Sequence, residues 1–181
     1  VAAVADHHGV RLEQRQQLAV DPPGVDRVGR GMQQGRVGGE RRLVPILRPY
    51  DPIGSTDDVY FDTTKTCFDT TKSHINRVAQ DSNWETELAS KLELMPEVVA
   101  YAKNQGLNLK IPYTFEGRAA NYVPDFLIRV RDRASRGDDD LLTLLLEVSG
   151  EAKKEKLAKV SAAADLWVPA INNWAGLGRW T

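Results

Sequence analysis

The sequence contains a single cysteine, Cys67, among its 181 residues. A disulfide framework and a zinc site built on paired cysteines are therefore excluded. No apolar run approaches the roughly 18–20 residues needed to span a bilayer, and the N-terminus has no charged start followed by an apolar block. These absences predict a cytoplasmic protein with no membrane partner.

The chain also lacks an excess of charge of either sign. Its formal net charge is −1, with 27% charged and 41% hydrophobic residues, which is typical of a globular protein rather than a disordered one. Binding to nucleic acid must therefore depend on local clusters of charge. No glycine-rich loop ends in Gly-Lys-Ser or Gly-Lys-Thr, so no ATP site is expected.

Composition divides the chain into three parts. Residues 1–45 hold seven of the 14 glycines and contain neither an aromatic residue nor a lysine, which predicts a flexible tail or a segment never selected to fold. Residues 46–80 have the prolines of an extended connector, followed by a threonine-rich ribbon in which residues 61–65 are repeated at 68–72. A plain β-ribbon is favoured here over a binding motif. Residues 81–181 are expected to form the folded domain, truncated at its C-terminus.

The domain begins with a helix. Ser82 and Glu85 form a capping-box pattern, and an apolar face then recurs at helical spacing until Pro96: Trp84, Leu88, Leu92 and Met95. Further along, we expect a short helix over 98–105, a strand over 107–115 and a turn at Gly117. Strands are predicted over 121–131, 141–148 and 167–171, and a helix over 151–166. This order predicts an α/β fold with a mixed central sheet flanked by helices.

Two strand-like runs each carry one carboxylate, Asp125 and Glu147. A carboxylate among Val, Leu and Ile is costly unless it is paired or bound to a cation. If the runs form an antiparallel hairpin, the two acids converge where the strands diverge and make an oxygen-rich site for Mg²⁺, the chemistry of phosphodiester hydrolysis. The alternatives are a turn residue after proline for Asp125 and an ion pair with Arg129 for Glu147.

Several segments together resemble a known family. They are DSNWE (81–85), KNQGL (103–107), IPYTF (111–115), YVPDFLIRV (122–130), LLLEVSGEAKKEK (144–156), LWVPAINN (166–173) and GRW (178–180). In order and spacing they resemble the C-terminal nuclease region of the type III restriction endonuclease Res subunit, within the PD-(D/E)xK nuclease superfamily. The resemblance covers about residues 43–181, without the helicase motor of those proteins.

The resemblance implies roles for particular residues. Asp125 and Glu147 would hold Mg²⁺ or Mn²⁺, and Glu85 would be an additional helix-borne ligand, although its place in the capping box also accounts for it. The family expects a lysine two residues after Glu147, where Ser149 stands. Lys153 or Lys154 would then assist catalysis from the next helix.

The resemblance also implies partners. The expected function is Mg²⁺-dependent cleavage of DNA, with a helicase motor and a methyltransferase subunit supplied by other chains. The DNA-binding candidates are Lys153, Lys154, Lys156 and Lys159, although lysines that alternate with glutamates also suit an ordinary solvated helix face. The alternative is a catalytically inactive remnant that binds DNA or docks to another subunit.

Other polar and aromatic residues have simpler explanations. His74 has no second histidine nearby, so packing or a surface hydrogen bond is favoured over a metal role. Tryptophans beside short apolar runs favour the core over base stacking: Trp167, Trp174 and Trp180. For Asn172 and Asn173, a turn and a phosphate contact remain equal alternatives.

Overall fold

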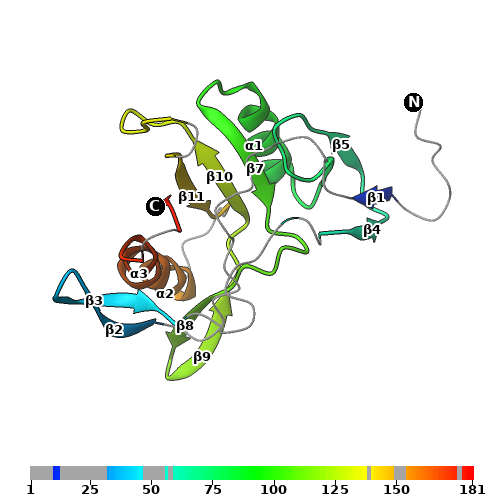
Figure 1. The fold of residues 1–181 in the computed structure, drawn as a ribbon. Coiled ribbons are helices and arrows are strands. Elements are labelled where there is room, and N and C mark those ends of the chain that lie inside the picture. Colours follow the sequence, from blue (N-terminus) through cyan, green and yellow to red (C-terminus); the bar gives the residue numbers. More distant parts are fainter. Residues whose placement is uncertain are drawn as a thin grey trace.

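The computed structural model describes residues 10–12, 32–46, 56, 59–137, 140–148, 154–174 and 177–181 (Figure 1). Within these residues the fold is mixed α/β, with several small sheets and few helices. No helix in the described part of the chain is long and apolar enough to cross a membrane.

The central sheet has four strands in the order β12–β11–β10–β7. Their bounds are Arg179–Trp180 for β12, Leu142–Leu146 for β11, Phe126–Val130 for β10 and Val98–Lys103 for β7. β10 is antiparallel to both of its neighbours, whereas β11 and β12 are parallel. The prediction of a mixed sheet is therefore confirmed.

Helices pack on both faces of this sheet. Phe126 and Ile128 belong to the same apolar cluster as the buried side of α1 (Asn83–Leu94). Leu127, whose side chain points the other way, belongs to the cluster that contains the π-helix η1 (Ala162–Trp167). This alternation is the period of two expected for a strand covered on both faces. The ends of β10 and β11 are thus held between two helical layers.

Small hairpins surround the sheet. β2 (Met32–Val37) pairs with β3 (Glu40–Pro45), and β8 (Ile111–Phe115) pairs with β9 (Arg118–Tyr122). The second hairpin turns at Gly117, which has a φ of 75°, as the sequence predicts. Three short strands occupy the threonine-rich ribbon: β4 (Phe61–Thr63), β5 (Cys67–Asp69) and β6 (Arg77–Ala79). β4 pairs with β1 (Val10–Leu12), and β5 pairs with β6.

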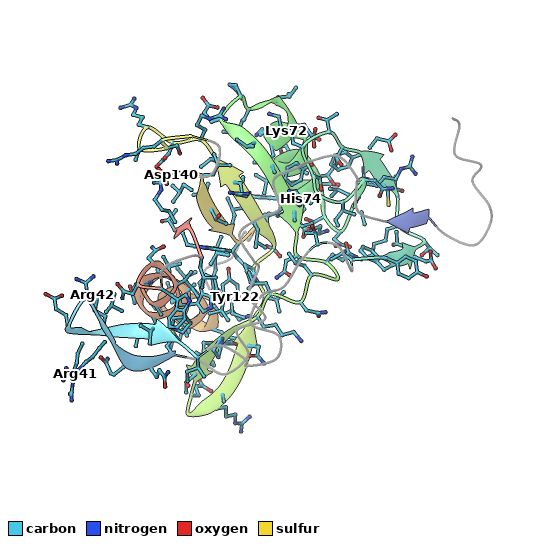
Figure 2. The ribbon with its side chains drawn as sticks, in the orientation of Figure 1. Arg41, Arg42, Lys72, His74, Tyr122 and Asp140 are labelled. Atoms are coloured by element: carbon cyan, nitrogen blue, oxygen red, sulfur yellow. The ribbon has the colours of Figure 1, made fainter. Side chains whose placement is uncertain are left out.

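Residues 32–45, within the segment predicted to be a flexible tail, form the β2–β3 hairpin. Val44 is buried, and the backbone oxygen of Leu43 accepts a 3.0 Å hydrogen bond from Nδ2 of Asn173. Arg41 projects outward from this hairpin (Figure 2), whereas Nη1 of Arg42 lies 3.5 Å from Oδ1 of Asn173. The hairpin therefore packs on the C-terminal helices.

Two predicted elements have the wrong type. Residues 98–103 form strand β7 rather than a helix, because they pair with β10 in the centre of the sheet. Residues 168–172 form helix α3 (Val168–Asn172) rather than a strand, because η1 continues directly into them. In addition, the predicted strand over 121–131 is divided: residues up to Tyr122 belong to β9, and β10 begins at Phe126.

The helical faces also differ from expectation. Ser82 caps α1 as predicted, accepting a 3.2 Å hydrogen bond from the backbone N–H of Glu85, and Leu92 is buried. Trp84 and Met95, however, are exposed. The predicted helix over 151–166 appears as α2 (Lys154–Ser161) followed by η1. Leu157 and Val160, which recur at helical spacing in the sequence, are exposed on it.

Candidate functional site

Asp125 and Glu147 lie at neighbouring ends of β10 and β11. The last regular pair of these strands joins Phe126 to Leu146, and the two acids are the next residues outward. The backbone N–H of Asp125 still donates to the carbonyl of Leu146 at 3.1 Å. Oδ2 of Asp125 in turn accepts a 2.6 Å hydrogen bond from the backbone N–H of Val148. The structure therefore brings the two predicted acids together.

The electrostatics of the pair reflect this proximity. Burial raises the pKa of Asp125, and the nearby Glu85 raises it further, against the opposing effects of the Val148 N–H and Lys103. Burial likewise raises the pKa of Glu147, followed by repulsion from Asp125. Both carboxylates thus hold their negative charge at a cost that a nearby cation would reduce.

Glu147 has one conspicuous partner. The hydroxyl of Tyr122 hydrogen-bonds its side chain, which lowers the pKa of Glu147, while burial raises the pKa of Tyr122 itself. Oε2 of Glu147 is buried and has no hydrogen-bond partner within the described residues. Tyr122 lies near the middle of the molecule (Figure 2). A carboxylate oxygen in this state is open to a cationic ligand.

Glu85 stands in a different arrangement. Its Oε2 lies 2.6 Å from Nζ of Lys103 without the alignment of a hydrogen bond, and the side chains are 15% and 10% exposed respectively. The same ammonium contacts Asp81 and donates to the carbonyl of Ala79 at 3.1 Å. No bond from the Glu85 carboxylate back to the Ser82 N–H is found among the described contacts. Glu85 is thus held by Lys103 rather than by the capping box.

The predicted three-carboxylate metal site is not assembled. In the described part of the chain, no group of three or more His, Cys, Asp or Glu side chains is arranged to hold a metal ion. Glu85 is ion-paired with Lys103, which leaves Asp125 and Glu147 as a pair. Their carboxylate oxygens are the ligands that a hard divalent cation prefers. One of these oxygens, Oε2 of Glu147, has no hydrogen-bond partner among the described residues.

Three of the four predicted DNA-binding lysines lie on α2: Lys154, Lys156 and Lys159. Lys153 and Ser149 lie outside the described residues. Lys154 is exposed at the start of α2, and Lys159 pairs with Glu155 at 3.4 Å, as expected for a solvated helix face. Lys159 and Lys156 nevertheless both lower the pKa of Glu147. The positive charge of these two lysines therefore acts on Glu147.

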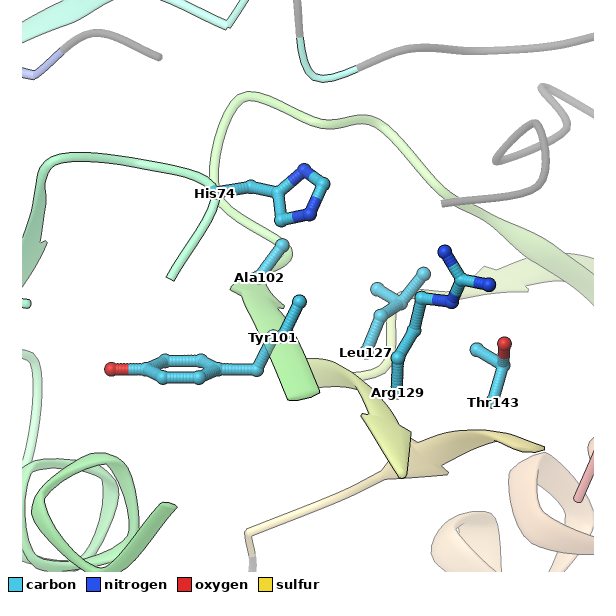
Figure 3. A pocket seen from close by; sticks show the side chains of 7 residues that line it. His74, Tyr101, Ala102, Leu127, Arg129 and Thr143 are labelled. Atoms are coloured by element: carbon cyan, nitrogen blue, oxygen red, sulfur yellow. The ribbon is translucent and has the colours of Figure 1, made fainter. Parts of the chain in front are cut away.

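A second polar region lies on the face of the sheet near β7, β10 and β11 (Figure 3). His74, Arg129 and Thr143 line a cavity of about 10 Å³, and Nδ1 of His74 is 3.1 Å from Oγ1 of Thr56. Such a volume suits about one water molecule and no substrate. His74 is therefore a packed, hydrogen-bonded residue, as the sequence predicts.

The C-terminal aromatic and amide residues are structural. Trp167 and Trp180 are buried and meet edge to face, with ring centroids 5.3 Å apart. Asn172 exchanges hydrogen bonds of 2.9 and 2.8 Å with the backbone of Trp180. Asn173 bonds the backbone of β3. Asn172 thus fixes the C-terminal chain and Asn173 joins α3 to β3, which favours the turn over the phosphate contact. Trp174, in contrast, is exposed, so the prediction that it belongs to the core is wrong.

Sequence reasoning missed three residues around the pair. Lys103 is a lysine in an otherwise apolar strand, the same signal that identifies the two acids, but its segment was predicted to be helical. Tyr122 carries no distinctive pattern. Asn104 binds the carbonyl oxygens of Pro124 and Leu109 at 2.9 Å, which fixes the approach to Asp125.

Comparisons with known proteins identify no relative. No protein-family model matches the chain, and no match is found among curated proteins or solved structures.

Proposed function

We propose that the chain is a divalent-metal-dependent DNA hydrolase with a PD-(D/E)xK-like core, a fragment of a type III restriction Res subunit. The observation that carries the proposal is the pairing of Asp125 and Glu147 at the ends of neighbouring antiparallel strands. In this proposal the protein is cytoplasmic and acts with a helicase motor and a methyltransferase supplied by other chains.

The cation would be held by this pair. The backbone N–H of Val148 donates to Oδ2 of Asp125, which fixes the orientation of that carboxylate. Oε2 of Glu147 has no described partner. When bound, Mg²⁺ or Mn²⁺ supplies Lewis-acid chemistry that acidifies water and offsets charge on a phosphodiester. Glu85 serves as a neighbouring acid whose charge Lys103 balances.

The remaining residues orient Glu147, contact the DNA or assist catalysis. Tyr122 orients Glu147 through its hydroxyl. Lys154, Lys156 and Lys159 supply positive charge for DNA phosphates along α2. Lys153 or Lys154 remains the proposed catalytic lysine, since Ser149 stands at the motif position.

The test is cleavage of supercoiled plasmid in Mg²⁺ or Mn²⁺. Wild type is compared with Asp125→Asn, Glu147→Gln and the matched control Asp165→Asn, whose side chain is exposed on η1. We expect nicking by wild type and by the control and none by the other two. Equal nicking by all four, or none by any, excludes the hydrolase.

One observation favours a second function, that of a catalytically inactive module which binds DNA or docks to another subunit. Leu157 is 65% exposed and Val160 is 43% exposed on α2. Exposed apolar side chains do not stabilise an isolated domain, whereas a partner subunit could cover them. This alternative predicts salt-sensitive DNA binding that persists in the Asp125→Asn/Glu147→Gln double variant, together with no nicking.

A further inference from the structure

Trp84 is the most exposed of the four tryptophans. Its side chain is 68% exposed, compared with 41% for Trp174, whereas Trp167 and Trp180 are buried. It lies in the first turn of α1, directly before Glu85. A large aromatic side chain in this position contributes little to the core, so packing does not explain it.

Trp84 lines an open cleft that also contains Glu147. The cleft has a volume of about 420 Å³, and its remaining lining residues are Glu87, Leu88, Lys91, Leu146 and Val148. Glu87 and Lys91 neutralise each other in an ion pair of 2.7 Å. The cleft therefore combines apolar side chains with the indole of Trp84 and one carboxylate of the candidate pair, Glu147.

Positively charged side chains also act on the carboxylate in this cleft. Lys156 and Lys159 lie close enough to Glu147 to lower its pKa. Sites that bind single-stranded nucleic acid usually combine exposed aromatic rings with positively charged side chains. The rings stack on the bases, and the charged groups contact the phosphate backbone. Bases within a duplex present no face to an indole at its side.

We propose that this cleft binds an unpaired nucleotide, with the indole of Trp84 stacked on its base. The substrate class of the proposed hydrolase is then DNA with an unpaired segment beside the carboxylate pair, such as a frayed end or a displaced strand. The claim that the cleft holds DNA at the site of cleavage rests on the proposed function. The binding event itself requires neither cation nor catalysis.

The experiment measures binding of a fluorescein-labelled single-stranded 12-mer and of the blunt duplex of the same sequence, about 12 nucleotides being enough to span one such site. Both are titrated in EDTA with the full chain carrying Asp125→Asn and Glu147→Gln. Variants Trp84→Ala and Trp84→Phe are compared in this background, with Trp174→Phe as the matched control. A cooperative thermal transition in far-ultraviolet circular dichroism checks that each variant is folded.

We expect tighter binding of the single strand than of the duplex. Trp84→Ala should weaken single-strand binding about 5- to 150-fold, the range for loss of one stacked base, while Trp84→Phe retains most of it and Trp174→Phe all of it. No binding of the single strand, or binding unaffected by Trp84→Ala, overturns the proposal even if plasmid nicking succeeds. Conversely, binding that depends on Trp84 supports it even if nicking fails.

Discussion

The backbone N–H of Val148 donates a 2.6 Å hydrogen bond to Oδ2 of Asp125. The residue that follows Glu147 thus holds the other acid in place, so the two carboxylates cannot move apart without breaking a charge-assisted bond. The close approach of two acids costs folding free energy, and such a cost is common where a site has a function other than stability.

Removing one charge of the pair should therefore stabilise the protein. Glu147→Gln abolishes the repulsion with Asp125, and we expect a gain of up to about 1 kcal/mol in the free energy of unfolding at pH 7. Urea denaturation checks this value. Glu97→Gln, at an exposed site, is the control and should change little. A clear loss of stability in Glu147→Gln would count against mutual repulsion.

The same pair predicts a pH dependence. The pKa values of Asp125 and Glu147 are raised in the folded protein, so the folded state binds more protons than the unfolded one. Their contribution to stability therefore falls as pH rises from about 4, the unfolded pKa of a carboxylate, through the raised folded values. In Glu147→Gln this fall should be smaller, as measured by urea denaturation between pH 4 and pH 8.

The opposite pH dependence of stability is expected for the two carboxylates that Arg179, the first residue of β12, binds. Arg179 binds Asp132 and Asp140 at 2.7 Å, and these bonds hold the pKa of both carboxyls below the usual range. Their stabilisation is present above about pH 4 and is lost as pH falls through the depressed values. Arg179→Gln should lower the melting temperature at pH 7 and reduce its loss on acidification. The exposed Arg133→Gln is the control; an identical acid profile in both variants contradicts the prediction.

Lys103 is expected to be important for stability. Lys103→Met leaves Glu85 without its ammonium partner and Asp81 with Lys65 alone, and loss of one member of a largely buried ion pair such as Lys103–Glu85 costs up to about 3–5 kcal/mol. The exposed Lys110→Met should cost much less. In a double-mutant cycle, Lys103→Met combined with Glu85→Gln should lose less than the sum of the single variants. Additive losses would show that the two side chains do not interact.

Local signals in the sequence predicted the elements that depend on local chemistry. Ser82 caps α1, and Gly117 supplies the positive φ of a tight hairpin turn. The meeting of Asp125 and Glu147 was also predictable, because both follow from strand register and from the cost of a carboxylate in an apolar strand.

The incorrect predictions concern residues whose secondary structure or exposure is determined by tertiary contacts. Residues 98–103 are apolar in a short run that suits a helix or a strand, and only pairing with β10 makes them a strand. That error concealed Lys103. The exposure of Trp84 could not be predicted from helical spacing, because the packed side of α1 is set by the sheet beneath it and not by the helix alone.

The central claim is that Asp125 and Glu147 together bind a divalent cation. The direct measurement is the melting temperature as a function of Mn²⁺ concentration, for wild type, Asp125→Asn, Glu147→Gln and the control Asp165→Asn. A cation bound only by the folded state adds about 2.7 kcal/mol at 100 times its dissociation constant. The account predicts a saturable rise in wild type and in the control that is absent from the other two variants. The same rise in all four proteins, or none in wild type, would contradict it.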